Sequence, residues 1–141
     1  MLKRTLNLLT CLILFFLISS CSEDSPIDPN ETTIQTPVAK LSDIQVKVFN
    51  VTCALSGCHG STNTQAGLLL TQGNSFSELV NVQGEAFTNF KRVVPDSSSQ
   101  SLLVKLIKGE LSPRMPKDRD ALPPAVIDSI VKWIDTGALN N

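Results

Sequence analysis

Two cysteines and the only histidine of this 141-residue chain stand together between positions 53 and 59. The segment reads CALSGCH, so four residues separate Cys53 from Cys58 and His59 follows directly. Two thiols beside an imidazole can form a disulfide, bind a metal or attach a cofactor. These three side chains constrain the fold more than any other feature, because each of those roles requires a tight loop around them.

Covalent attachment of haem c uses this pattern. Two cysteines bond the porphyrin edge and the histidine after the second one ligates the iron, usually as C-x-x-C-H. The wider gap requires a bulged loop, and Ala54, Ser56 and Gly57 are small enough to form one. Two other interpretations stay open. One is a Cys53–Cys58 disulfide, and the other is a zinc site, which needs a fourth ligand.

Met115 is the only methionine besides Met1. It lies in a segment from 111 to 122 that we expect to be an extended loop, because Pro113 and Pro116 flank it. Methionines usually fill gaps in a core. A methionine held in a loop can instead be the second axial ligand of an electron-transfer cytochrome. We therefore predict His59 and Met115 as the two ligands of a haem iron.

Three further residues are candidates for cofactor binding. A ligating imidazole normally donates its other N–H to a carbonyl, and a carbonyl near Pro95 or one in the Gly60–Gly67 loop could accept it. Arg92 or Arg114 could pair with a haem propionate, or remain a solvated surface charge. The sequence contains no second histidine, no G-x-S-x-G and no phosphate-binding loop. We therefore do not expect an enzyme.

The N-terminal residues predict export. Lys3 and Arg4 precede an apolar run, and Ile18-Ser19-Ser20-Cys21 resembles the lipobox of bacterial lipoproteins. We expect a signal peptide over residues 1–20, which contains Cys11, and lipidation of Cys21. An ordinary signal peptide or an uncleaved anchor are the alternatives. The polar, acidic residues 21–39 should form a disordered tether, and residues 40–141 one domain.

Charge and cysteine use limit the function further. Without residues 1–20 the chain has ten basic and thirteen acidic residues, a net charge of −3. This balance gives no basic patch for nucleic acid. Only Cys53 and Cys58 remain besides the lipidated Cys21, and bare thiols in an oxidising compartment form a disulfide unless another chemistry uses them.

The hydrophobic pattern predicts an all-α domain. A first helix begins near Ser42 and runs into Cys53, and a short helix lies near Phe76–Val80. Two more span about Ser99–Lys108 and Pro124–Gly137. This order places the histidine after an early helix and the methionine in a late loop before the terminal helix.

From about Ile44 to Asn141 the chain resembles the small cytochrome c domains of exported proteins in Bacteroidetes and Planctomycetes. Five motifs carry the resemblance: CALSGCHG from Cys53, AGLLL from Ala66, RVVP from Arg92 with SLL from Ser101, RMP from Arg114, and IVKWIDTGA from Ile130. The resemblance implies a cytochrome c fold around one covalent haem, with His59 and Met115 as iron ligands.

These observations predict a lipid-anchored, monohaem c-type cytochrome that transfers electrons between redox partner proteins. We expect a monomer at the outer membrane, either on its periplasmic face or at the cell surface. Two alternatives remain at this stage. One is a non-redox surface lipoprotein with a Cys53–Cys58 disulfide, and the other is a haem sensor or peroxidase-like domain with an open iron site.

Overall fold

The computed structural model describes residues 34–61 and 64–141. The predicted signal peptide with Cys11, the lipidation site Cys21 and most of the predicted tether lie outside the described residues. None of the helices in the described ranges has the length and apolar character that crossing a bilayer requires.

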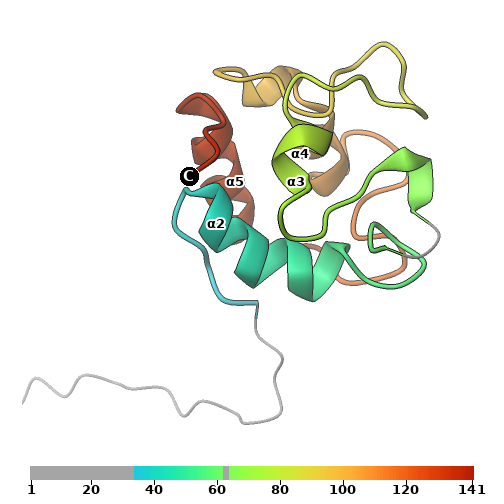
Figure 1. Cartoon of the computed structure of the whole chain (residues 1–141), viewed down its shortest axis with the longest axis horizontal. Helices are drawn as coiled ribbons and strands as arrows, with labels where there is room; N and C mark the ends of the chain where they lie inside the picture. Colours follow the sequence, from blue (N-terminus) through green and yellow to red (C-terminus); the bar gives the residue numbers. More distant parts are fainter. Residues whose placement is uncertain (1–33, 62–63) are drawn as a thin grey trace, which may run out of the picture. The chain divides into compact units, whose positions relative to one another are not determined.

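The described residues form short helices and two isolated β-bridges. The first helix has two parts: α2 spans Leu41–Ile44 and continues, through residues with helical dihedral angles, into the π-helix η1, Gln45–Cys53 (Figure 1). The others are the 3₁₀ turn η2 (Gln65–Gly67), α3 (Ser75–Leu79), the 3₁₀ turn η3 (Ser98–Gln100), α4 (Leu102–Ile107) and α5 (Pro124–Asp135).

The core lies where the first helix meets α5, which contacts α2. Ile44 and Val48 from the first helix, and Ile130 and Ile134 from α5, are fully buried in one apolar cluster. Trp133 is also buried, and its indole N–H donates to the carbonyl of Leu139 at 2.9 Å. The cluster fixes the position of the helix that ends at Cys53.

The helix predicted over Ser99–Lys108 is divided into η3 and α4. Ser101 is extended, with φ −80° and ψ 124°, and its hydroxyl donates to the carbonyl of Ser97 at 3.0 Å. The same oxygen accepts the backbone N–H of Val94 at 2.9 Å. A serine that bonds to nearby backbone competes with helical hydrogen bonds, and these contacts interrupt the helix.

The terminal helix is confirmed, with its last two residues in a different conformation. α5 starts with Pro124 in its first turn and ends at Asp135. Gly137 then adopts a φ of +100°, and the amides of Gly137 and Ala138 bond back to the carbonyls of Ile134 and Trp133. This is a glycine-terminated helix end.

The segment upstream of residue 40 packs against the domain. Pro37 is buried, and Ile34 and Ala39 contact the apolar core. The packed region therefore includes part of the stretch predicted to be a tether, because these three apolar side chains cover surface of the core. At the start of α2, Asn141 accepts the amides of Leu41 and Ser42, which have no partner within the helix.

The two β-bridges connect the segments on either side of a loop. Val80 pairs with Val93 in parallel, and Gln83 pairs with Lys91 in antiparallel fashion. Arg92 therefore sits between two bridged residues, and its amide donates to the carbonyl of Val82 at 2.7 Å.

Candidate functional site

The loop that carries the two cysteines and the histidine begins where η1 ends. The amide of His59 donates to the carbonyl of Cys53 at 3.1 Å, and the amides of Cys58 and Gly60 both donate to Leu55, at 3.0 and 3.2 Å. Gly57, at the outer turn of the loop, has a φ of +78° with open space around it. The four-residue gap thus forms a compact bulge that brings the backbone of His59 next to that of Cys53.

Gly60 is the point of closest approach in this bulge. A Cβ atom at this position would lie 2.8 Å from the carbonyl oxygen of Ala54 and 2.9 Å from that of Leu55. Both atoms belong to the backbone, so they cannot rotate away as a side chain could. The residue after the histidine must therefore be a glycine for the loop to close as it does.

The imidazole of His59 has a defined tautomer. Its Nδ1 lies 3.2 Å from the carbonyl oxygen of Leu68. Because a carbonyl can only accept, Nδ1 carries the proton, and in the neutral ring Nε2 carries the lone pair. The backbone reinforces this arrangement, since the amide of Leu70 donates to the carbonyl of His59 and the amide of Gln65 to that of Cys58, both at 2.8 Å. An Nδ1–H held by a carbonyl is the usual support for a histidine that ligates a metal through Nε2.

The electrostatic surroundings favour a neutral imidazole. Burial lowers the pKa of His59, and the positive charge of Arg92 acts in the same direction, while the carbonyls of Leu68 and Gln65 oppose both. A neutral imidazole is the form that binds a metal ion.

Cys53 and Cys58 are both free thiols in the structure. Cys53 is partly buried against the apolar core, and Cys58 is exposed. Burial, and to a smaller extent the neighbouring Cys58, raises the pKa of Cys53 to about 12. Cys53 is therefore protonated at neutral pH.

The acceptor for His59 differs from both predicted positions. Leu68 lies one residue beyond the Gly60–Gly67 loop, and its carbonyl, not one at Pro95, bonds Nδ1. Pro95 lies instead in a turn between the bridge segment and η3, where the amide of Ser97 donates to the carbonyl of Val94. A main-chain acceptor can be supplied by any residue, so the sequence carries no signal for Leu68.

Arg92 is buried, with 6% of its surface exposed. Its Nη1 donates to the backbone carbonyl and carboxylate of Glu78 at 2.9 and 3.1 Å. Its Nη2 donates to the carbonyls of Ala66 and Gly67 at 3.0 and 3.1 Å. The guanidinium therefore binds protein groups on two segments, a role that differs from the propionate contact or solvated charge expected from the sequence.

Arg114 has different surroundings. Its Nη2 donates to the carbonyl of Arg119 at 2.6 Å, whereas its Nη1 is buried and has no hydrogen-bond partner in the described part of the chain. Buried donors without partners are rare and call for an explanation. A carboxylate at this position would supply the missing acceptor, so Arg114 fits the propionate role better than Arg92.

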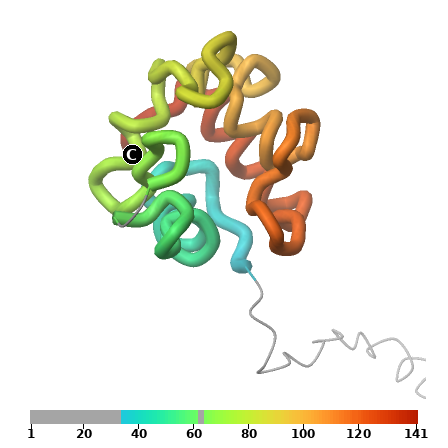
Figure 2. The backbone as a smooth tube through the Cα atoms, turned by 90° about the vertical axis from the view of Figure 1, so that its right-hand side faces the viewer, coloured from blue at the N-terminus to red at the C-terminus, as the bar shows by residue number. Residues whose placement is uncertain are grey.

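Met115 lies next to Arg114 in an irregular loop. Its side chain is partly buried and packs against the apolar core, and its amide donates to the carbonyl of Leu106 at 3.0 Å, which attaches the loop to α4. In Figure 2 this loop (orange) and the segment around Cys53 to Leu70 (green) lie on opposite sides of one view of the domain.

The His59 Nδ1–H bond, the two free thiols and the unpaired donor of Arg114 together are compatible with a haem group.

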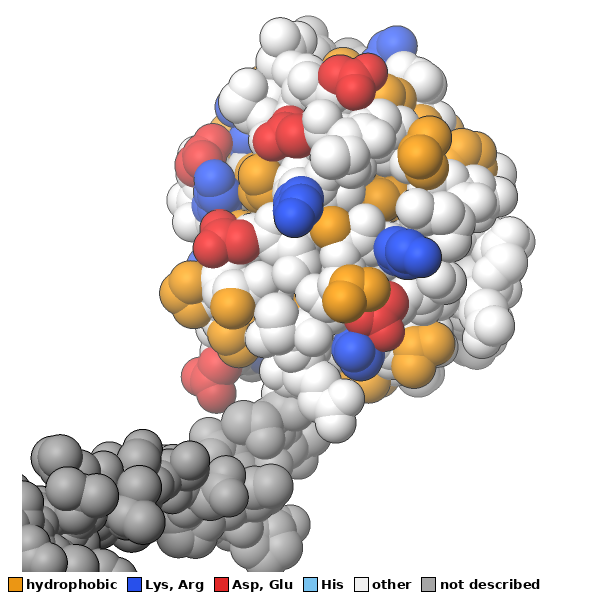
Figure 3. Space-filling model, turned by 90° about the vertical axis from the view of Figure 1, so that its left-hand side faces the viewer, with side chains coloured by type: hydrophobic (Ala, Val, Ile, Leu, Met, Phe, Trp, Pro, Cys, Tyr) orange, Lys and Arg blue, Asp and Glu red, His pale blue; other side chains and the backbone are white. Residues whose placement is uncertain are grey.

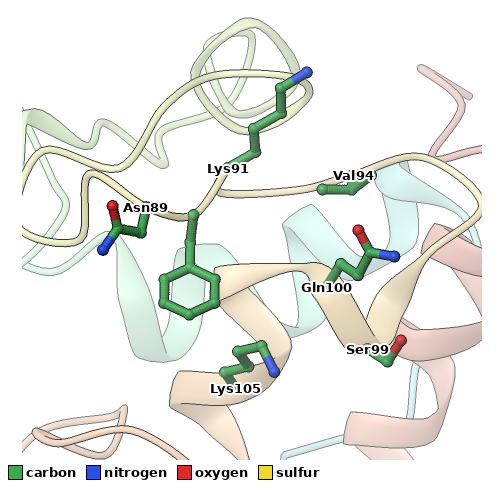
Figure 4. A pocket seen from close by; sticks show the side chains of 7 residues that line it. Asn89, Lys91, Val94, Ser99, Gln100 and Lys105 are labelled. Atoms are coloured by element: carbon green, nitrogen blue, oxygen red, sulfur yellow. The ribbon is translucent and has the colours of Figure 1, made fainter.

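Within residues 34–61 and 64–141, no three His, Cys, Asp or Glu side chains come together as a metal-binding group. A pocket of about 510 Å³ lies elsewhere and contains none of the predicted site residues (Figure 4). Its lysines already have partners: Lys91 bonds Asn81, while Lys105 approaches Glu110 at 3.6 Å and the ring of Phe90 at 5.7 Å. On the face seen in Figure 3, basic and acidic side chains are interspersed.

Comparison with known proteins gives no relative. No family model matches the sequence, and neither a curated protein nor a solved structure matches the chain.

Proposed function

We propose that this chain is a monohaem c-type cytochrome that transfers electrons and is anchored by a lipid at Cys21. The proposal depends above all on His59, whose Nδ1–H is held by the carbonyl of Leu68 and which directly follows one of two free thiols. An imidazole with that tautomer can ligate iron through Nε2.

The two cysteines hold the haem in this proposal. Each thiol would add its sulfur to one carbon of a porphyrin vinyl group and its hydrogen to the other, so the thioether would form without an oxidant. The bulge between Cys53 and His59 would keep both thioether bonds close to the imidazole of His59.

His59 and Met115 are the proposed axial ligands. When bound, the haem iron supplies one-electron chemistry. A neutral imidazole and a thioether as ligands would favour the ferrous state and raise the reduction potential. Arg114 would donate its unpaired Nη1–H to a propionate. With His59 and Met115 both bound to the iron, no position would stay open for a substrate, so we propose an electron carrier and not an enzyme.

The remaining proposals concern location and partners. A lipid at Cys21 would hold the domain at the outer membrane, on its periplasmic face or at the cell surface, and the residues before the domain would act as a tether. We propose a monomer that meets redox proteins transiently. The mixed charges visible in Figure 3 are compatible with short-lived encounters, because no single sign dominates that face.

The first test is a reduced pyridine haemochrome spectrum with an intact mass, on protein purified from its native host. We expect a c-type spectrum and a mass gain of one haem that persists after acidic acetone extraction. A Cys53→Ser variant should still gain haem through a single thioether and show the spectrum of one remaining vinyl group. A Cys53→Ser, Cys58→Ser double variant should lose its haem to the solvent.

Two outcomes would favour the other interpretations. A colourless protein that is two hydrogens lighter than the reduced chain would establish a Cys53–Cys58 disulfide and refute electron transfer. A haem protein that binds carbon monoxide readily in its reduced, wild-type form would have an exchangeable iron position, as a sensor or peroxidase-like domain requires. Firm coordination by His59 and Met115 resists that binding.

A further inference from the structure

We propose that Arg92 is the positioning residue for His59, because it holds the carbonyls of Ala66 and Gly67 so that the next carbonyl, that of Leu68, stays in place as the acceptor for Nδ1–H. This inference rests on the proposed function, in which His59 ligates the iron. It assigns Arg92 to the orientation of the ligand and not to a propionate.

The backbone of Arg92 is fixed on both sides. Its amide donates to the carbonyl of Val82 at 2.7 Å, and its carbonyl accepts the amide of Leu103 at 3.0 Å. The flanking Val93 is fully buried and bridged to Val80. The guanidinium therefore extends from backbone that hydrogen bonds and burial hold in place.

The guanidinium uses its planar fork in full. Nη1 binds the carbonyl and the carboxylate of Glu78, and Nη2 binds Ala66 and Gly67, with all four distances between 2.9 and 3.1 Å. The ion pair with Glu78 compensates the buried charge, since only 7% of the Arg92 side chain is exposed. A lysine cannot make these contacts, because its single ammonium group lacks the fork geometry.

The loop that Arg92 holds has an unusual backbone. Ala66 has a φ of +51° and Gly67 a φ of +56°, so two consecutive residues are left-handed. A residue with a side chain rarely adopts this conformation and needs support from its surroundings. Arg92 provides that support directly, because its Nη2 bonds the carbonyls of these two residues. Leu68 follows immediately in an extended conformation, and its carbonyl reaches His59.

The test measures the tautomer of His59 in the full chain labelled with ¹⁵N. Because the chain has one histidine, the ring signals need no assignment among residues. In haem-free protein we expect the wild type to carry the proton on Nδ1. The Arg92→Gln variant should raise the Nε2–H population about tenfold, as expected for weakening one hydrogen bond. In reduced, haem-loaded protein, exchange of the Nδ1 proton with solvent should accelerate by a similar factor.

Two further variants separate the explanations. Arg92→Lys keeps the charge and the buried stem, so it provides the test if Arg92→Gln does not fold. It should also raise the Nε2–H population of His59. Lys91→Gln removes an exposed neighbouring charge that bonds only Asn81 in the described chain, and it should leave His59 unchanged.

Each outcome bears on one proposal. A wild-type tautomer population of His59 in Arg92→Lys would mean that the positive charge suffices, and it would overturn the positioning role. An unchanged tautomer population in Arg92→Gln would overturn it as well. Protein that never carries haem, yet loses the Nδ1–H tautomer in both Arg92 variants, would refute the cytochrome proposal alone.

Discussion

Replacing Gly60 by alanine tests whether the loop around the two cysteines depends on backbone contact. The added Cβ would lie 2.8 Å from the carbonyl oxygen of Ala54 and 2.9 Å from that of Leu55. Leu55 already accepts two amides, so its carbonyl cannot rotate without losing them. The loop must open, which lengthens the bonds from His59 to Cys53 and from Gly60 to Leu55.

The size of the effect follows from these contacts. Forcing a methyl group into a closely packed site costs about 1–3 kcal/mol, and each weakened backbone hydrogen bond costs about 1 kcal/mol. Alanine also restricts the unfolded chain, which offsets about 0.4–1 kcal/mol. We therefore expect Gly60→Ala to lower the free energy of unfolding by about 2–4 kcal/mol. For a domain of this size, the midpoint temperature should fall by roughly 10–25 °C.

Urea unfolding, followed by tryptophan fluorescence, measures this cost through Trp133. Gly73→Ala is the matched control, because Gly73 has a φ of +87° but open space around its Cβ position. It should cost only about 1 kcal/mol, the penalty for a left-handed alanine. Haem content by intact mass should fall in Gly60→Ala and stay at the wild-type level in Gly73→Ala. Equal unfolding free energies in the two variants would refute the argument from close approach.

Three further predictions concern the ligands and the terminal helix. Met115→Ala should lower the reduction potential and let carbon monoxide bind the reduced protein, since a thioether ligand favours ferrous iron; an unchanged potential in a redox titration would count against Met115. Burial lowers the pKa of His59 in the folded state, so the unfolded state takes up the proton first as the pH falls. The free energy of unfolding of the haem-free protein should therefore decrease below pH 6.5, the ordinary pKa of histidine. In His59→Gln, the free energy of unfolding measured with urea should no longer depend on pH in this range. A pH dependence that persists in the variant would contradict the role of His59. Asp135→Ala should cost about 1–2 kcal/mol in urea unfolding, because its oxygens accept the amide and hydroxyl of Ser98 at 2.8 and 2.9 Å. The exposed Asp128→Ala is the control, and an equal cost in the two variants would refute the contribution of these hydrogen bonds.

The helices that sequence patterns predict best are those with local signals. Val126, Ile130 and Ile134 repeat at helical spacing between a proline and a glycine, and the structure places α5 there. The break at Ser101 has no such signal. It depends on the hydrogen bonds that join the serine hydroxyl to the amide of Val94 and to the carbonyl of Ser97 in the preceding turn. The hydrophobic pattern does not record bonds between a side chain and the nearby backbone.

The same distinction applies to the candidate site. Cys53, Cys58 and His59 are recognisable because they are chemically distinctive and adjacent in sequence. The acceptor at Leu68 is a main-chain oxygen, and the contacts of Arg92 are mostly main-chain oxygens as well. The sequence therefore indicates the charge of Arg92 but not its partners, and the propionate role is the simplest expectation for such a charge.

The hydrogen bonds around His59 differ in how far they reach along the chain. The bond to Leu68 spans nine residues, whereas those from Arg92 to Ala66 and Gly67 span 26 and 25. Short loops close quickly and at a small entropic cost, and longer ones close later. The histidine loop can therefore form before Arg92 holds it, because Arg92 lies further along the chain and must first be brought back to residues 66 and 67. If the cysteines attach a haem as proposed, the attachment segment is the part of the domain that can take shape first.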